Sequence, residues 1–284
     1  MNSKAHIPFA LVLAGGGARG LAHAGVLRAL AHYGFRPSAV VGVSMGAVVA
    51  VTYALNPDWY RALVNMDTSG FPDPAKATTS DFRERVRALL ASERMLQDMI
   101  LGWGVGARSL EWGRALLEHL TLGRRLEQGR IRVAAVATDL NHGRRVVLQR
   151  GSAAEAAYAS SALAGLLPPL PHDDGLLADG CYADLVPIDV ARGPDNDLVI
   201  AVDVQQQVDL RPPSNGIQAI LRAVDICSDE HARLRFTEAD FVIRPQFPFS
   251  IDTLEFSCKR FCIAAGNRAV RTSIEDLRQL LQKT

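Results

Sequence analysis

The chain has 284 residues, of which 48% are apolar and 21% charged, and its formal net charge is +1. This length and composition are typical of a globular protein with one well-buried core. The neutral charge balance and the 6% aromatic content argue against a surface built to bind nucleic acid. The four cysteines include no CxxC pair, and we expect neither a metal site nor a cofactor.

The first part of the chain alternates between predicted strands and helices. Residues 9–14 form a continuous apolar run, which is typical of a strand buried on both faces. A glycine-rich loop and an amphipathic helix follow. A second apolar run at 39–43 leads directly into an alanine-rich helix that ends near residue 56, before a proline.

The pattern changes over residues 57–128, where charges are dense, glycines are scattered and apolar residues recur at helical spacing. We expect a helical insertion here. It divides a core of residues 8–56 and 129–284, and the chain as a whole is expected to form a single domain (1–284).

Strands resume after the insertion. The expected elements are strands at 131–138, 198–204 and 240–243, a hairpin partner at 144–149, a helix capped by Ser152, and a C-terminal helix through Val270, Ile274, Leu277 and Leu281. Strands that alternate with helices indicate an α/β fold with three layers, in which helices cover both faces of a mostly parallel central sheet.

The glycine-rich loop reads GGGARG and stands between the first strand and its helix. Dinucleotide-binding folds have a similar loop, followed about 20 residues later by an acidic residue that holds the ribose. No Asp or Glu precedes Asp58 in this chain. The loop's backbone N–H groups therefore favour an oxyanion over a nucleotide phosphate. The expected donors are Gly15, Gly16, Gly17 and Ala18.

The second strand ends in Gly42-Val43-Ser44-Met45-Gly46, which matches the G-x-S-x-G nucleophile elbow. In such an elbow the serine occupies a tight strand-to-helix turn, and the glycines make room for the crowded backbone. The simpler alternative is a serine that caps the helix beside small packing residues. The flanking strand and the upstream glycine loop favour Ser44 as a nucleophile.

A serine nucleophile needs a base. Among the seven histidines, His231 alone lies late enough for the chain order of an α/β-hydrolase, and it stands in a charged helical segment. An Asp-Gly pair, Asp179-Gly180, ends a short apolar run. From the residues alone, an esterase that depends on His231 and a serine activated by an aspartate remain alternatives.

The ordered blocks resemble the patatin-like phospholipase family, which carries a GGGxRG loop, a GxSxG elbow and a downstream Asp-Gly pair. The segments VAAVATDLNHGRRVVLQRG and AYASSALAGLLPPLPHDDGLLADGCYADLVPIDVAR are also similar to bacterial members. The resemblance covers most of residues 9–204 outside the insertion. It implies a patatin-like α/β/α fold and a Ser44–Asp179 dyad without histidine. It also implies hydrolysis of phospholipids or other acyl esters through an acyl-enzyme.

On this interpretation, Arg19 positions the glycine loop or binds a phosphate head group, with a simple surface position as the alternative. Gly20 and Gly180 serve the turns. Two residues depart from the family pattern. Cys181 follows Gly180 where glycine or alanine is usual, and the turn is expected to survive. Ala164 stands where proline is common, which is expected to loosen that loop.

No apolar stretch reaches the roughly 18 residues that a membrane-spanning helix needs. We expect a cytoplasmic protein, with peripheral membrane contact left open. Apolar residues crowded into 95–103, followed by glycines, favour a lid that faces lipid, with simple coverage of the core as the alternative. The rival in another class is a nucleotide- or lipid-binding regulatory scaffold without turnover. Oligomeric state is left undetermined.

Overall fold

The computed structural model describes residues 7–69, 107–193, 198–206 and 216–282. Its centre is an eight-stranded sheet in the order β5-β6-β3-β2-β1-β7-β8, with β4 paired to the other edge of β3. The strands are β1 (Phe9–Leu13), β2 (Ala39–Val43), β3 (Arg132–Asp139), β4 (Arg144–Leu148), β5 (Leu170–His172), β6 (Gly175–Asp179), β7 (Leu198–Val202) and β8 (Phe241–Ile243).

The central strands β3, β2, β1, β7 and β8 are parallel, and β4, β5 and β6 join by antiparallel pairing. The helices are α1 (Ala22–His32), α2 (Met45–Leu55), α3 (Trp59–Val64), α5 (Ala107–Thr121), α6 (Ala153–Ser161), α7 (Ile188–Ala191), α8 (Gly216–Phe236), α9 (Lys259–Thr272) and α10 (Ile274–Leu281). Short 3-10 helices are η1 (Gly17–Leu21), η3 (Leu126–Gln128), η4 (Gly180–Tyr182) and η5 (Phe256–Cys258).

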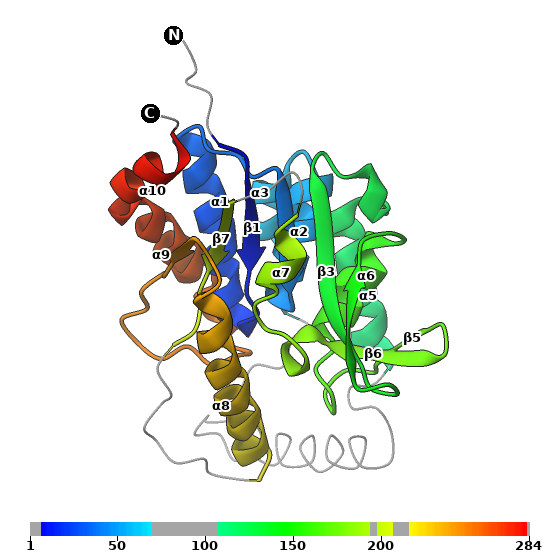
Figure 1. The fold of residues 1–284 in the computed structure, drawn as a ribbon. Helices are drawn as coiled ribbons and strands as arrows, with labels where there is room; N and C mark the ends of the chain where they lie inside the picture. Colours follow the sequence, from blue (N-terminus) through cyan, green and yellow to red (C-terminus); the bar gives the residue numbers. More distant parts are fainter. Residues whose placement is uncertain (1–6, 70–106, 194–197, 207–215, 283–284) are drawn as a thin grey trace.

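The sheet separates two hydrophobic layers. Alternate residues of β1 point to opposite faces, so that Leu11 joins the larger cluster with α1, α2, α6 and α9, whereas Val12 joins the smaller cluster with α7 and α8. Figure 1 views the sheet from the side that α7 covers. The fully buried strand β1 thus reads as an unbroken apolar run, because helices cover it on both faces. The predicted three-layer α/β/α fold is confirmed.

The register of β3 brings two distant segments together. Val136 of β3 lies opposite Val43, the last residue of β2, and the next residue of β3, Ala137, lies opposite Asp179, the last residue of β6. Because β4 occupies the other edge of β3 at these positions, β2 and β6 share one edge and their ends meet there. The residue after β2 therefore lies beside the end of β6.

One predicted element is wrong in its extent. The apolar pattern from Val270 to Leu281 predicts a single C-terminal helix, but α9 ends at Thr272 and α10 begins at Ile274. The intervening Ser273 donates its hydroxyl to the Ala269 carbonyl at 2.6 Å. A serine that binds the backbone of the preceding turn bends or interrupts a helix. The two short helices still bury Val270, Leu277 and Leu281 together.

The expected insertion over 57–128 contains α3 and α5 among the described residues. The apolar residues at 95–103, on which the lid prediction depends, lie outside the described residues. Within the described part of the chain, no helix is both long enough and apolar enough to span a bilayer. The single-domain division and the lid stay predictions.

Candidate active site

The turn at Ser44 has the geometry of a nucleophile elbow. Ser44 has φ 55° and ψ −127°, a backbone conformation that a side chain rarely adopts and that costs about 1–3 kcal/mol. The flanking glycines leave no room for a side chain. A Cβ at Gly42 would lie 2.3 Å from the Gly46 carbonyl oxygen, and a Cβ at Gly46 would lie 2.1 Å from the Leu13 carbonyl oxygen. Tight packing thus requires both glycines of the motif.

A serine from α6 supports this turn. The Ser44 N–H donates to the Ser160 hydroxyl at 2.9 Å, and that hydroxyl donates in turn to the Val136 carbonyl at 2.5 Å. Ser160 is fully buried. Ser160 lies 116 positions from Ser44 in a run of alanines and serines, and the sequence did not predict its role. No local pattern distinguishes it from its neighbours.

The Ser44 side chain points at Asp179. The Ser44 hydroxyl donates to Asp179 Oδ2 at 2.7 Å, and the Cys181 N–H donates to Asp179 Oδ1 at 2.9 Å. Thr138 donates its hydroxyl to the Asp179 carbonyl at 2.8 Å, which fixes the backbone of the aspartate. The structure thus brings together the two residues that the family resemblance selected.

Burial makes Asp179 a stronger base than an exposed aspartate. Its side chain is fully buried, and loss of solvation raises its pKa from 3.8 to about 6. The hydrogen bonds from Cys181 and Ser44 act in the opposite direction and lower the pKa. The pKa lies close to neutrality, so the carboxylate both accepts a proton readily and is ionised at pH 7.

The two departures from the family pattern have local explanations. The turn after Asp179 forms with Cys181 in place, because the Cys181 backbone N–H, which any residue other than proline supplies, donates to the carboxylate at 2.9 Å. Ala164 was expected to loosen its loop, but its N–H donates to the Tyr182 hydroxyl at 3.0 Å. A proline has no N–H and could not make this hydrogen bond.

The glycine loop packs closely beside the elbow. A Cβ at Gly15 would lie 2.5 Å from a methyl carbon of Leu185, and a Cβ at Gly20 would lie 2.7 Å from Cβ of Met45. Gly17 has φ +52° and lies against the Thr253 carbonyl, so a side chain there is excluded both by conformation and by space.

The backbone N–H groups of the loop differ in whether they already have an acceptor. Within the described ranges, the N–H groups of Gly15, Gly16 and Gly17 have no acceptor in the protein. Ala18 was expected to be a fourth donor, but its N–H donates to the Thr253 carbonyl at 2.8 Å. The loop conformation turns this N–H away into the neighbouring backbone, so Ala18 is removed from the set of available donors.

Arg19 anchors the loop to the β8–α9 connection. Its guanidinium donates to the Ile251 carbonyl at 2.6 Å and to the Val204 carbonyl at 3.3 Å. These contacts connect the glycine loop with the segments after β7 and after β8. Of the two roles considered for Arg19, the contacts favour positioning of the loop over binding of a head group.

No hydrogen bond joins Ser44 to a histidine in the part of the chain that the structure describes. His231 is exposed on α8, and no hydrogen bond joins it to Ser44 among the described residues. His23 is fully buried on α1, where its Nε2 lies 2.8 Å from the Ala14 carbonyl at the end of β1. Burial lowers the pKa of His23 to about 4, so the ring is neutral and donates to that carbonyl.

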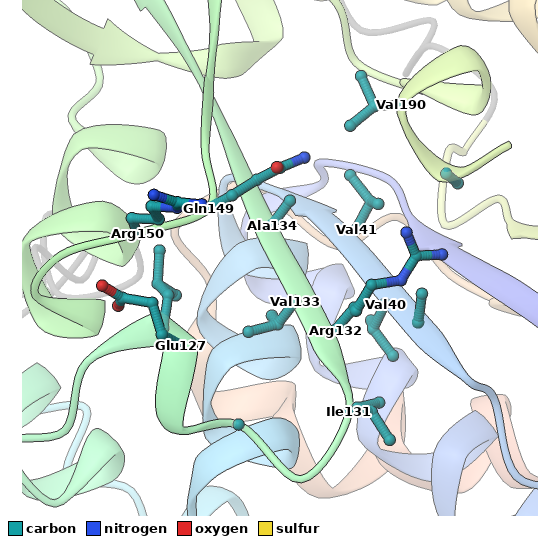
Figure 2. A pocket seen from close by; sticks show the side chains of 14 residues that line it. Val40, Val41, Glu127, Ile131, Arg132, Val133, Ala134, Gln149, Arg150 and Val190 are labelled. Carbon is teal, nitrogen blue, oxygen red and sulfur yellow. The ribbon is translucent and has the colours of Figure 1, made fainter. Parts of the chain in front are cut away.

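A cavity of about 290 Å³ lies at the amino ends of β2 and β3 (Figure 2). It is lined by the first residues of β2 and β3, among them Val41 and Ala134, and by Arg150 at its rim. Ser44 and Asp179 stand at the carboxyl ends of their strands, so this cavity is separate from them. Across the described ranges, no three His, Cys, Asp or Glu side chains are grouped in a way that could hold a metal ion.

Comparison with known proteins identifies similar sequences and a similar fold. The family model for patatin-like phospholipase matches residues 11–192. Lysophospholipase NTE1 of Cryptococcus neoformans is 33% identical over 206 residues, which cover 72% of this chain and 12% of the fungal protein. Patatin-like phospholipase domain-containing protein 7 of Rattus norvegicus is 32% identical over 197 residues, which cover 69% of this chain and 13% of the rat protein.

This chain therefore spans only about an eighth of the length of these two relatives. Among solved structures, VipD from Legionella pneumophila superposes with a TM-score of 0.53, at 15% identity, over 96% of this chain and 68% of VipD. At this identity the match concerns the fold alone.

Proposed function

Because this chain belongs to the patatin-like phospholipase family, we propose that it is a serine hydrolase that cleaves carboxylic ester bonds of lipids through a Ser44–Asp179 dyad. The observation that carries the proposal is the 2.7 Å hydrogen bond from the Ser44 hydroxyl to a buried carboxylate, within an elbow strained at the serine itself. Strain at one residue that tight packing maintains is a feature of functional sites.

In the acylation step, Ser44 Oγ attacks the ester carbonyl carbon while its proton passes to Asp179 Oδ2. The carbonyl π electrons move onto the oxygen, and a tetrahedral oxyanion forms. When the oxyanion collapses, the bond to the leaving alcohol breaks and the alcohol oxygen takes the proton from Asp179. Ser44 is then esterified by the acyl group, and the dyad carboxylate is regenerated.

In the deacylation step, a water molecule attacks the acyl-serine and gives its proton to Asp179. A second oxyanion forms at the same position and collapses, which releases the fatty acid and returns the proton to Ser44. Both oxyanions face the free N–H groups of Gly15, Gly16 and Gly17, and Ser44 stands at the N-terminus of α2, where the helix dipole favours negative charge. Each such donor typically contributes about 3 kcal/mol to the transition state.

The substrate class follows from the relatives. The two relatives are a lysophospholipase and a patatin-like phospholipase domain-containing protein. We propose a phospholipid or lysophospholipid as the substrate of this chain, reached by peripheral contact with a membrane. The proposed lid role of the insertion at 57–128 would shield the acyl chain during this contact.

The test is ester hydrolysis together with fluorophosphonate labelling of the purified protein. Ser44→Ala and Asp179→Asn should each lower hydrolysis by about a thousandfold or more, since members of a nucleophile–base pair act as a unit. Ser44→Ala should also abolish labelling. The control is His231→Ala, which should retain parental activity. Near-parental turnover in Asp179→Asn, or loss of activity in folded His231→Ala, would overturn the dyad.

A further inference from the structure

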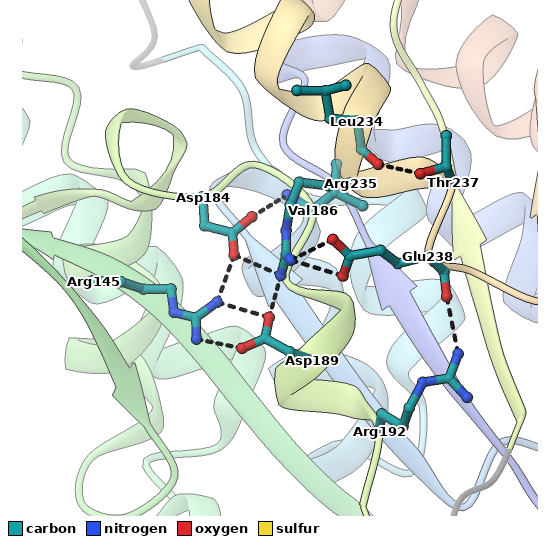
Figure 3. A network of polar contacts seen from close by, with 9 residues as sticks. All are labelled: Arg145, Asp184, Val186, Asp189, Arg192, Leu234, Arg235, Thr237 and Glu238. Atoms are coloured by element: carbon teal, nitrogen blue, oxygen red, sulfur yellow. Dashed lines mark hydrogen bonds and ion pairs between the residues drawn. The ribbon is translucent and has the colours of Figure 1, made fainter.

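A network of five charged side chains lies next to the segment that follows Asp179 (Figure 3). Arg145 of β4 contacts Asp184 at 2.6 Å and binds both carboxylate oxygens of Asp189, at 2.9 and 2.5 Å. Arg235 of α8 contacts the same two aspartates and also binds Glu238 at 2.8 Å. The network therefore joins β4, α7 and α8 through the segment between η4 and α7.

Asp184 is the buried centre of this network. Its side chain is 5% exposed, compared with 48% for Asp189 and 47% for Glu238. One oxygen of Asp184 meets both arginines, and the other accepts the Val186 N–H at 3.1 Å. A buried carboxylate requires such partners, because an unpaired charge in the interior is strongly unfavourable. Asp184 is thus held in one position from both sides.

The same residue is bonded to the turn that carries the base. The Asp184 N–H donates to the Gly180 carbonyl at 2.9 Å, one residue after Asp179. Arg145 is also connected to Asp179 indirectly, because it lies directly opposite Thr138 in the β3–β4 pair. The Thr138 hydroxyl donates to the Asp179 carbonyl at 2.8 Å. The turn after Asp179 is thus hydrogen-bonded to Asp184 of the network. The Asp179 carbonyl is hydrogen-bonded to Thr138, the residue of β3 that pairs with Arg145.

The residue after Asp184 contacts the glycine loop. Leu185 is buried, and one of its methyl carbons lies so close to Gly15 that a Cβ there would be only 2.5 Å away. The side chain of Leu185 therefore rests directly against the backbone whose N–H groups face the oxyanion. Residues 179–185 thus connect the base at one end with the oxyanion loop at the other, and Asp184 is fixed between them.

We propose that Asp184, clamped by Arg145 and Arg235, is a positioning residue that sets the base and the oxyanion loop relative to Ser44. The inference rests on the proposed function, since it takes Asp179 as the base and the glycine loop as the oxyanion site. The clamp acts through the backbone from Asp179 to Leu185. It contacts neither the substrate nor the reacting atoms.

This role differs from that of an ordinary surface ion pair. Exposed pairs such as Arg278–Glu275 on α10 contribute little to stability, because solvent screens the two charges. In the Asp184 network the charges restrain a segment that ends in the base. Burial raises the Asp179 pKa, and the hydrogen bonds from Cys181 and Ser44 lower it. Asp184 and the two arginines act on that pKa indirectly, by keeping the turn closed.

The test compares Arg145→Met and Asp184→Asn with the parent on a soluble short-chain ester. Fluorophosphonate titration counts the active sites, so that kcat refers to folded enzyme only. We expect kcat per site to fall about tenfold or more while KM changes less than about twofold, because small displacements of catalytic groups reduce the rate steeply. A loosened turn also admits water to Asp179. The acid midpoint of kcat/KM should therefore move from about 6 to lower pH.

Arg278→Met is the matched control and should change neither kcat nor the midpoint. If Asp184→Asn does not fold, Arg145→Met and Arg145→Lys decide, and the lysine variant should be partly impaired because it lacks the two-pronged contact. Parental kcat per site and an unmoved midpoint in the folded variants would overturn the proposal. Activity in Ser44→Ala would instead overturn the proposed function, so that the two failures are distinguishable.

Discussion

Replacing Asp179 by asparagine should make the protein inactive and, at neutral pH, more stable. The folded state raises the Asp179 pKa from 3.8 to about 6 because the carboxylate is fully buried. The folded protein therefore binds this proton more tightly than the unfolded chain does. Between about pH 4 and pH 6 the native state holds the proton while the unfolded state releases it. The contribution of Asp179 to stability thus falls as pH rises through this window.

The size of the effect follows from the shift. About two pKa units correspond to about 3 kcal/mol between low pH, where the native carboxyl is neutral, and pH 7, where it is ionised. Asparagine has a similar shape, accepts the Cys181 N–H and does not ionise. The free energy of unfolding of Asp179→Asn, minus that of the parent, should therefore increase by about 2 kcal/mol between pH 4 and pH 7, because the unfolded carboxyl is already partly ionised at pH 4.

The assay is urea unfolding of both proteins at several pH values between 4 and 8. Taking the difference removes the contributions of the other titrating groups, which both proteins share. The pH–rate profile of the parent provides a second readout, with half-maximal kcat/KM near pH 6 and a roughly tenfold loss for each unit below it. A stability difference that stays constant with pH, together with an acid midpoint near 4, would refute the argument that burial activates the base.

Four further substitutions test the surroundings of the site and the helix α5. Ser160→Ala removes the acceptor of the Ser44 N–H and should lower kcat about tenfold with a smaller effect on KM, measured by steady-state kinetics. Gly46→Ala inserts a Cβ 2.1 Å from a carbonyl oxygen and should destabilise the fold by about 3 kcal/mol or more in denaturant unfolding. Gly113→Ala on α5, with open space around it, should instead stabilise by up to about 1 kcal/mol. Arg19→Met should lower kcat/KM equally for a phospholipid and for a neutral short-chain ester, and a loss confined to the phospholipid would contradict a positioning role.

Local patterns predicted most of the central fold. The strand at 39–43 agrees with the structure residue for residue, and the strand at 9–14 differs by one residue at its end. These strands are buried on both faces, so every side chain is apolar and the run is unmistakable. The β5–β6 hairpin was not predicted, because β5 has only three residues, one of them a proline, and two aspartates follow it, a pattern that resembles a loop.

The amino-acid sequence by itself predicted Ser44 as the nucleophile. Ser44 lies between a strand and a helix with glycines two positions before and after it, and these constraints act within five residues. The choice of base could not be made in this way. The residues alone leave His231 and Asp179 open as the base, and only the family resemblance favours Asp179.

Only the tertiary structure decided which distant groups surround the dyad. Ser160 under the elbow, the occupied N–H of Ala18 and the clamp on Asp184 all depend on contacts between segments far apart in the chain. The register of β3 places the ends of β2 and β6 side by side, and that register is set by burial across the whole sheet. Secondary structure depends on neighbours in sequence, whereas a catalytic site depends on neighbours in space. A single sequence therefore fixes the first largely by local pattern and the second only through the packed fold.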